Sequence, residues 1–209
     1  MPELIIFQLA VLIFSVMIHE VSHGYVAEHL GDPTARLAGR LTFNPLKHID
    51  PIGSIFLPLI LSIAGGPVFG WAKPVPYNPN NLKNPAMAGG KIAAAGPVSN
   101  LLIAVVFGLF IRIFSAVGLL SEFLFLLFST IVYLNILLAV FNLVPIPPLD
   151  GSKVLFAAVP KSESFLRLFA QLERYGMLLV FLFVFFGFEL ITPIINFIFF
   201  VLTGQYFAQ

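Results

Sequence analysis

The chain has 209 residues, of which 59% are hydrophobic and only 10% are charged, and its mean hydropathy is +0.99. Soluble domains keep about a quarter of their residues charged, so this composition excludes a soluble enzyme and indicates an integral membrane protein. A formal charge of +1 without any basic cluster argues against a nucleic-acid partner. Because there is no cysteine, only nitrogen and oxygen ligands are offered to a metal.

The first apolar segment lies near residues 4–22 and has no basic residue before it. A secretory signal begins with basic residues, so we interpret this segment as a retained membrane helix. Its inner end carries HEVSH, from His19 to His23. Residues four apart share one face of a helix, so the two imidazoles can bind one Zn²⁺ while Glu20 acts as general base. Two hydrogen-bonded histidines at a helix end are the simpler alternative.

A polar stretch follows, and within it the sequence RLAGRLTF, residues 36–43, shows short alternation with Thr and Phe. This pattern favours a small β-element with an exposed edge. A helical substrate hides its amides, so a protease must hold it in an unwound, extended form. We expect the edge residues Arg40, Leu41 and Thr42 to do so by strand addition.

Three further apolar segments lie near residues 52–69, 91–118 and 123–143, and most of the apolar stretches match the ~20 residues that cross a bilayer as a helix. If all crossed, His23 and Asp150 would leave the membrane on opposite faces. If the segment near residues 52–69 instead enters the membrane and returns, His23 and Asp150 lie on the same face. The segment's helix-breaking residues suit a re-entrant path: Gly53, Pro58, Gly65, Gly66 and Pro67.

The re-entrant arrangement also places every basic residue except Arg112 on a single face of the membrane. By the positive-inside rule this face is cytoplasmic, and the amino terminus is outside. We therefore expect a multi-pass protein of the cell membrane with its active site toward the cytoplasm.

A catalytic zinc has three protein ligands and one open position, so HEVSH requires a third ligand from elsewhere. Asp32 and Asp50 each precede a proline and are typical of turns, whereas His29 and His48 sit in a polar stretch and are expected to be solvated or structural. Asp150 ends a long uncharged run at NLVPIPPLDG, where prolines release backbone groups that only a protein interior or a wet cavity can satisfy. It is a candidate ligand, and a helix-capping or turn aspartate is the alternative.

Four motifs in this order, HEVSHG, GRLTFNPLKHIDPIG, AAGPVSN and FNLVPIPPLDG, resemble the site-2 protease family of intramembrane zinc metalloproteases, peptidase M50 type. The resemblance runs from about residue 10 to residue 155 and implies that Asp150 is the third zinc ligand. It also implies that Asn100 and Asn142 lie near the site and bind substrate carbonyls or an oxyanion. Related proteases have a small sheet after the first helix. The chain looks like a minimal member, without a PDZ domain.

We therefore expect an all-α polytopic membrane protein with a re-entrant segment and a small β-element. One domain would cover residues 1–209, with its core at 4–155 and a C-terminal membrane tail at 165–205. The expected function is zinc-dependent endopeptidase activity on a membrane-protein or signal-peptide substrate within or beside the lipid bilayer. The sequence does not determine the oligomeric state.

Two other functions differ in class. A metal or ion transporter would distribute ionisable groups along its path, and the central apolar segments have almost none. A non-catalytic membrane binding protein on a protease scaffold would have no need of Glu20.

Overall fold

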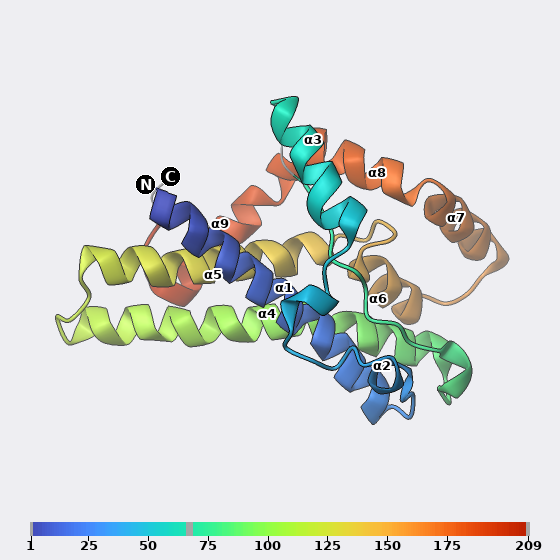
Figure 1. Cartoon of the computed structure of the whole chain (residues 1–209). Helices are drawn as coiled ribbons and strands as arrows, with labels where there is room; N and C mark the ends of the chain where they lie inside the picture. The colour runs from blue at the N-terminus through green and yellow to red at the C-terminus, as the bar shows by residue number, and fades with distance from the viewer. Residues whose placement is uncertain (1, 66–68, 208–209) are drawn as a thin grey trace.

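The computed structural model describes residues 2–65 and 69–207, and three helices in this part of the chain are long and apolar enough to cross a bilayer. They are α1 (Pro2–His29), α4 (Pro85–Ala116) and α5 (Glu122–Asn142). In Figure 1, α4 and α5 run side by side and antiparallel, and α1 crosses them. The expected all-helical, polytopic membrane protein is confirmed at this level.

The long helices approach closely because small residues line α4. Ala88, Gly89, Ala93 and Gly96 are all buried on this helix, and small side chains let helix backbones come together in lipid. The turn from α4 to α5 uses Gly118 in the left-handed conformation, at φ +71°. A hydroxyl cap then begins α5, since Ser121 accepts a hydrogen bond from the Leu124 amide.

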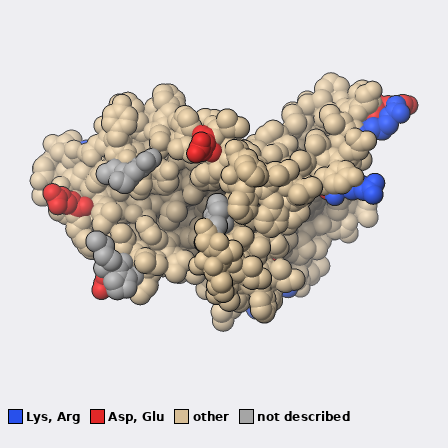
Figure 2. Space-filling view, turned by 90° about the horizontal axis from the view of Figure 1, so that it is seen from above, with Lys and Arg blue, Asp and Glu red and all other residues tan. Residues whose placement is uncertain are grey.

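The largest apolar core lies between α4, α5 and α9 (Thr192–Thr203). Ile111, Ile136 and Phe199 are fully buried there. Many other large apolar side chains are exposed on the outer faces of the helices. Figure 2 shows a face that is almost free of charged side chains over most of its area, as expected for a surface covered by lipid.

In the apolar segment after α1, the described helical part is too short to cross a bilayer. It forms a π-helical stretch, Pro51–Phe56, followed by α3 (Leu57–Ile63). Together these span about 20 Å at 1.5 Å per residue, less than the ~30 Å of hydrocarbon. The chain then comes back to its starting point, because the Trp71 amide donates to the Gly53 carbonyl at 3.1 Å. This out-and-back path supports the re-entrant prediction, although Gly66 and Pro67 lie outside the described residues.

The predicted β-element is wrong: residues 36–43 contain no strand, and neither does any other described residue. A short helix, α2 (Thr34–Leu37), occupies the start of the segment. Gly39, at φ +64°, then ends it with a Schellman pair of hydrogen bonds, from the Gly39 amide to the Arg36 carbonyl and from the Arg40 amide to the Ala35 carbonyl. The glycine at the centre of RLAGRLTF therefore works as a helix stop and not as a strand residue.

The rest of the chain after α5 is helical as well. α6 (Asp150–Ala158) is followed by α7 (Glu163–Arg174), whose Phe165 and Phe169 stack on Phe156 of α6. A 70° bend separates α7 from the helical stretch Gly176–Leu190. The remaining elements are α8 (Gly176–Leu182), a π-helical turn (Phe183–Gly187) and three 3-10 turns (Pro45–Lys47, Pro79–Asn81 and Phe188–Leu190).

Candidate metal centre

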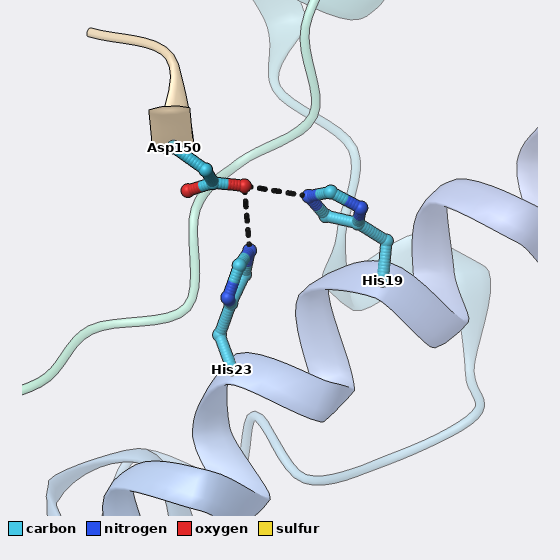
Figure 3. Close-up of side chains that lie close together, drawn as sticks. All are labelled: His19, His23 and Asp150. Carbon is cyan, nitrogen blue, oxygen red and sulfur yellow. Dashed lines mark hydrogen bonds and ion pairs between the residues drawn. The ribbon is translucent and has the colours of Figure 1, made fainter. Parts of the chain in front are cut away.

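His19 and His23 of α1 meet Asp150, the first residue of α6, although 127 positions (150 − 23) separate the aspartate from the nearer histidine. The Nε2 atoms of His19 and His23 lie 3.1 Å and 3.2 Å from Asp150 Oδ2. One ligand atom from each residue lies within 4.8 Å of the others. Figure 3 shows the two rings converging on one carboxylate oxygen. His19 and Asp150 are only 5% and 8% exposed, so the cluster is shielded from solvent.

Both imidazoles are held from behind, at the ring nitrogen that points away from Asp150. His19 Nδ1 lies 2.6 Å from Asn100 Oδ1, and His23 Nδ1 lies 2.6 Å from the Ile92 carbonyl oxygen. Each of these oxygens can only accept, so each Nδ1 carries the proton and donates. The lone pair of each Nε2 is then directed into the cluster, which is the tautomer that a metal requires.

Asp150 is placed by the tight start of α6. It does not cap this helix, since the N-cap residue is Leu149 and no side chain makes a capping hydrogen bond. Gly151 allows the close approach: a Cβ atom there would stand 2.1 Å from the Leu143 carbonyl oxygen at the end of α5. Burial opposes ionisation of Asp150, but when His19 and His23 carry a proton on Nε2 as well, their hydrogen bonds and charges outweigh burial and lower the pKa of its carboxyl group.

The cluster packs closely against the backbone of α4. Gly96 of α4 faces it, and a Cβ atom at this position would lie 2.5 Å from His19 Nε2 and 2.6 Å from His23 Nε2. Two imidazoles, one carboxylate and no thiolate form a ligand set of the kind found in catalytic zinc sites, which keep a fourth position open. The residues present therefore fit a Zn²⁺ ion.

Glu20 stands next to His19 on α1 but outside the ligand group. Its Oε2 accepts a hydrogen bond from the Val75 amide at 2.9 Å. Val75 lies between Pro74 and Pro76, and proline has no amide hydrogen to offer. The one amide in this three-residue stretch is thus the one that holds the carboxylate of Glu20.

The comparisons with known proteins bear on the same motifs. Residues 116–186 match the model of Peptidase family M50. Over 204 residues the chain is 40% identical to "Putative zinc metalloprotease YwhC" of Bacillus subtilis, covering 94% of this chain and 87% of that protein. The chain belongs to peptidase family M50. The site-2 protease resemblance is thereby confirmed.

Two further M50 relatives extend the match. "Putative zinc metalloprotease Rip2" of Mycolicibacterium smegmatis is 31% identical over 199 residues, which cover 93% of this chain and 70% of that protein. "Putative zinc metalloprotease MJ0611" of Methanocaldococcus jannaschii is 46% identical over 66 residues, 32% of each chain. No solved structure matches the chain.

The two asparagines expected near the site of this M50 member lie in different surroundings. Asn100 of α4 is fully buried behind His19, with its side-chain oxygen on the imidazole. Asn142 ends α5, is partly exposed, and donates its amide to the Leu138 carbonyl of its own helix at 2.9 Å. The end of α5 lies against the start of α6 through Leu143 and Gly151. Asn142 is therefore a neighbour of the α6 start that carries Asp150.

The residues expected to form a substrate edge instead join neighbouring loops together. The Arg40 guanidinium donates to the Lys73 carbonyl at 2.6 Å. The Thr42 carbonyl accepts from His48 Nε2 at 2.9 Å, and His48 is buried. Leu41 lies against Gly24, where a Cβ atom would meet it at 2.5 Å. The structural role expected for His48 fits these contacts.

Two residues of the site were missed by sequence reasoning. Gly96 stands in a run of small residues. Such a run is equally typical of helix packing and of a backbone that approaches a metal site, so the sequence did not distinguish the two. Val75 stands in KPVP, where two prolines around a single amide were the available signal.

Proposed function

We propose that this M50 member is a zinc-dependent endopeptidase that cleaves peptide bonds within or beside the transmembrane segments of membrane-bound substrates. The meeting of His19, His23 and Asp150 within 4.8 Å carries the proposal. His19 and His23 lie on α1, a candidate membrane span, so a metal held there would lie beside the bilayer or inside it. Zinc is supported by the ligand set and by the names of the relatives.

A bound zinc ion would supply Lewis acidity, polarising the scissile carbonyl group and making water a nucleophile near neutral pH. Glu20 takes the proton of the attacking water and passes a proton to the departing amine. The Val75 amide fixes Glu20 Oε2. Within the described residues Oε1 has no hydrogen bond, so it is the oxygen that exchanges protons.

The substrate would be a membrane protein or a signal peptide with a locally unwound segment, because the amides of an intact helix are already paired. Asn142 is our candidate for a donor to the developing oxyanion. Its support is its partial exposure and its position beside the start of α6. A single such donor is worth ~3 to 4 kcal/mol in other proteases. The positive-inside rule favours a cytoplasmic approach to the site.

The test uses the intact chain in liposomes with a panel of signal peptides and single-span helices, and maps cut sites by mass spectrometry. Glu20→Gln should keep one zinc per chain and lose cleavage, because it keeps the shape of the side chain but removes the base. Removal of zinc by a chelator should stop cleavage by the parent protein, and added zinc should restore it.

Products that persist in Glu20→Gln would refute the assigned base, and cuts confined to soluble loops far from any span would refute the membrane location. Zinc flux in the same liposomes, without cleavage, would favour the transporter alternative.

A further inference from the structure

His19 stands at one end of a buried chain of polar side chains that joins α1, α4 and α5. Behind the imidazole, Asn100 Nδ2 donates to Asn135 Oδ1 at 2.9 Å and to the Ser15 carbonyl oxygen at 3.3 Å. Asn135 Nδ2 in turn donates to Ser15 Oγ and to the Ile131 carbonyl oxygen, both at 2.9 Å. Asn100 and Asn135 are 0% exposed and Ser15 is 4% exposed.

The network allows only one orientation of the Asn100 amide. Its nitrogen faces two oxygens, on Asn135 and Ser15, while its oxygen faces His19 Nδ1. A half-turn of the amide would set its oxygen against both of these oxygens and lose both hydrogen bonds. Asn135 is fixed by the Ile131 carbonyl, which can only accept and so must face its nitrogen; that nitrogen also donates to the Ser15 hydroxyl, and its oxygen accepts from Asn100. Asn135, which does not contact His19, thus helps to decide that Asn100 presents its oxygen and not its nitrogen to His19 Nδ1.

We propose that Asn135 and Ser15, acting through Asn100, are positioning residues that hold His19 in the tautomer and ring orientation that zinc binding requires. The inference rests on the zinc site of the proposed function and assigns part of its affinity to side chains that never touch the metal. Partners that hydrogen-bond a ligand directly, as Asn100 does, typically change metal affinity by 10- to 100-fold when they are removed, and residues that act through them change it by less.

His23 provides an internal contrast. Its Nδ1 is held by the Ile92 backbone carbonyl, an acceptor that no side-chain substitution removes. The two histidines of one motif are therefore supported differently. Only His19 depends on side chains from three helices, so its tautomer is sensitive to mutation and that of His23 is not.

A matched control lies on the same helix as Asn135. Thr130 is also buried on α5, and its hydroxyl donates to the Leu126 carbonyl of its own helix at 2.8 Å. Thr130→Val removes one buried polar group from α5 but touches neither the network nor His19. It separates a loss of positioning from a general loss of buried hydrogen bonding.

The experiment measures the zinc dissociation constant of the full chain in detergent micelles by competition with a chromogenic chelator. Asn100→Leu, which removes the acceptor from His19 itself, should weaken zinc binding by about 10- to 100-fold. Asn135→Leu and Ser15→Ala should weaken it by smaller factors, and Thr130→Val not at all. Asn100→Asp should lose less affinity than Asn100→Leu, because one carboxylate oxygen still accepts from His19 Nδ1 although the other faces the oxygens of Asn135 and Ser15.

Parent-like affinity in both Asn135→Leu and Ser15→Ala, with only a lower melting temperature, would overturn the proposal and leave the network a structural one. If Asn135→Leu does not fold, Ser15→Ala and the Asn100 pair decide the result. The assay follows zinc and not cleavage, so an absence of protease activity would count against the proposed function and leave this result standing.

Discussion

Asp32 and Asp150 are both buried aspartates, but they lie in opposite kinds of surroundings. Asp32 accepts hydrogen bonds from the Thr34 amide and hydroxyl, the Asn78 amide and the Asn81 side chain. Asp150 faces the Nε2 atoms of two imidazoles. Amide and hydroxyl donors keep their protons, whereas an imidazole can present a lone pair instead. A carboxylate of the first kind holds loops together, and one of the second kind can share a metal.

The pKa values of both carboxyl groups are lowered, so the direction of the shift does not distinguish the two aspartates. Burial raises the pKa of Asp32, but its hydrogen bonds from Thr34, Asn81 and Asn78 outweigh burial and lower it overall. For Asp150 the imidazoles produce the same direction. What distinguishes them is whether the neighbours can give up their protons to make room for a cation.

The largest expected effect comes from filling the space beside the two Nε2 atoms. Gly96→Ala should abolish zinc binding, because the new Cβ would lie 2.5 Å from His19 Nε2. Gly89→Ala on the same helix is the control, since its Cβ meets only the Tyr77 hydroxyl at 3.7 Å. Zinc content of the purified chains is the measurement. Full zinc occupancy in Gly96→Ala would show that the metal does not lie between these residues.

Removal of the carboxylate at the metal centre should act on zinc more than on folding. We expect Asp150→Ala to weaken zinc binding by more than about 100-fold, beyond the range for residues that only orient a ligand. Thermal unfolding of the zinc-free chain should change less, because both imidazoles keep their other hydrogen bonds, to Asn100 and to the Ile92 carbonyl. Isothermal titration with zinc measures the first effect and circular dichroism the second. Unchanged zinc affinity would refute the ligand role of Asp150.

Asp32→Ala should do the reverse. Four donors lose their acceptor, and we expect a loss of about 2 to 4 kcal/mol in unfolding free energy, at roughly 0.5 to 1 kcal/mol for each partly exposed donor. Zinc affinity should stay near that of the parent. Asp50→Ala is the control with a smaller expected loss of stability, because Asp50 accepts a hydrogen bond from only one amide among the described residues, that of Gly53. A loss of zinc without a loss of stability in Asp32→Ala would remove the distinction drawn between the two aspartates.

The smallest effect is a dependence of stability on pH. A folded-state pKa below the unfolded value of about 3.9 means that ionised Asp32 contributes its full stability above the unfolded pKa and loses it as the pH falls below that value and through the lower folded-state pKa. The advantage of the parent over Asp32→Asn should therefore shrink on acidification. Unfolding of the zinc-free chains at a series of pH values measures it, and an advantage that grows toward low pH has the wrong sign for this explanation.

Part of this contrast could be predicted from the sequence because the information is local. The spacing of HEVSH puts His19 and His23 on one helix face, and the prolines after Asp32 and Asp50 indicated turns. The local surroundings of Asp150 made it one candidate ligand, and the family resemblance was needed to choose it, since no local pattern brings residue 150 to residue 23. Tertiary contact decides that kind of proximity.

The wrong strand prediction and the two missed site residues have the same origin, because tertiary contacts decided all three. The alternation of residues 36–43 favoured a strand, but the left-handed Gly39 closes a helix there. The roles of Gly96 and Val75 follow from which residues stand opposite them, and that is set by how α1, α4 and the extended chain pack.

X-ray absorption at the zinc edge of Glu20→Gln protein examines the coordination directly, without any need for a substrate. We predict one zinc per chain with two imidazole nitrogens and oxygen ligands, at about 2.0 to 2.2 Å, and the loss of this spectrum in Asp150→Ala. A zinc ion with one imidazole or none, or the same spectrum after removal of Asp150, would contradict a centre built from His19, His23 and Asp150.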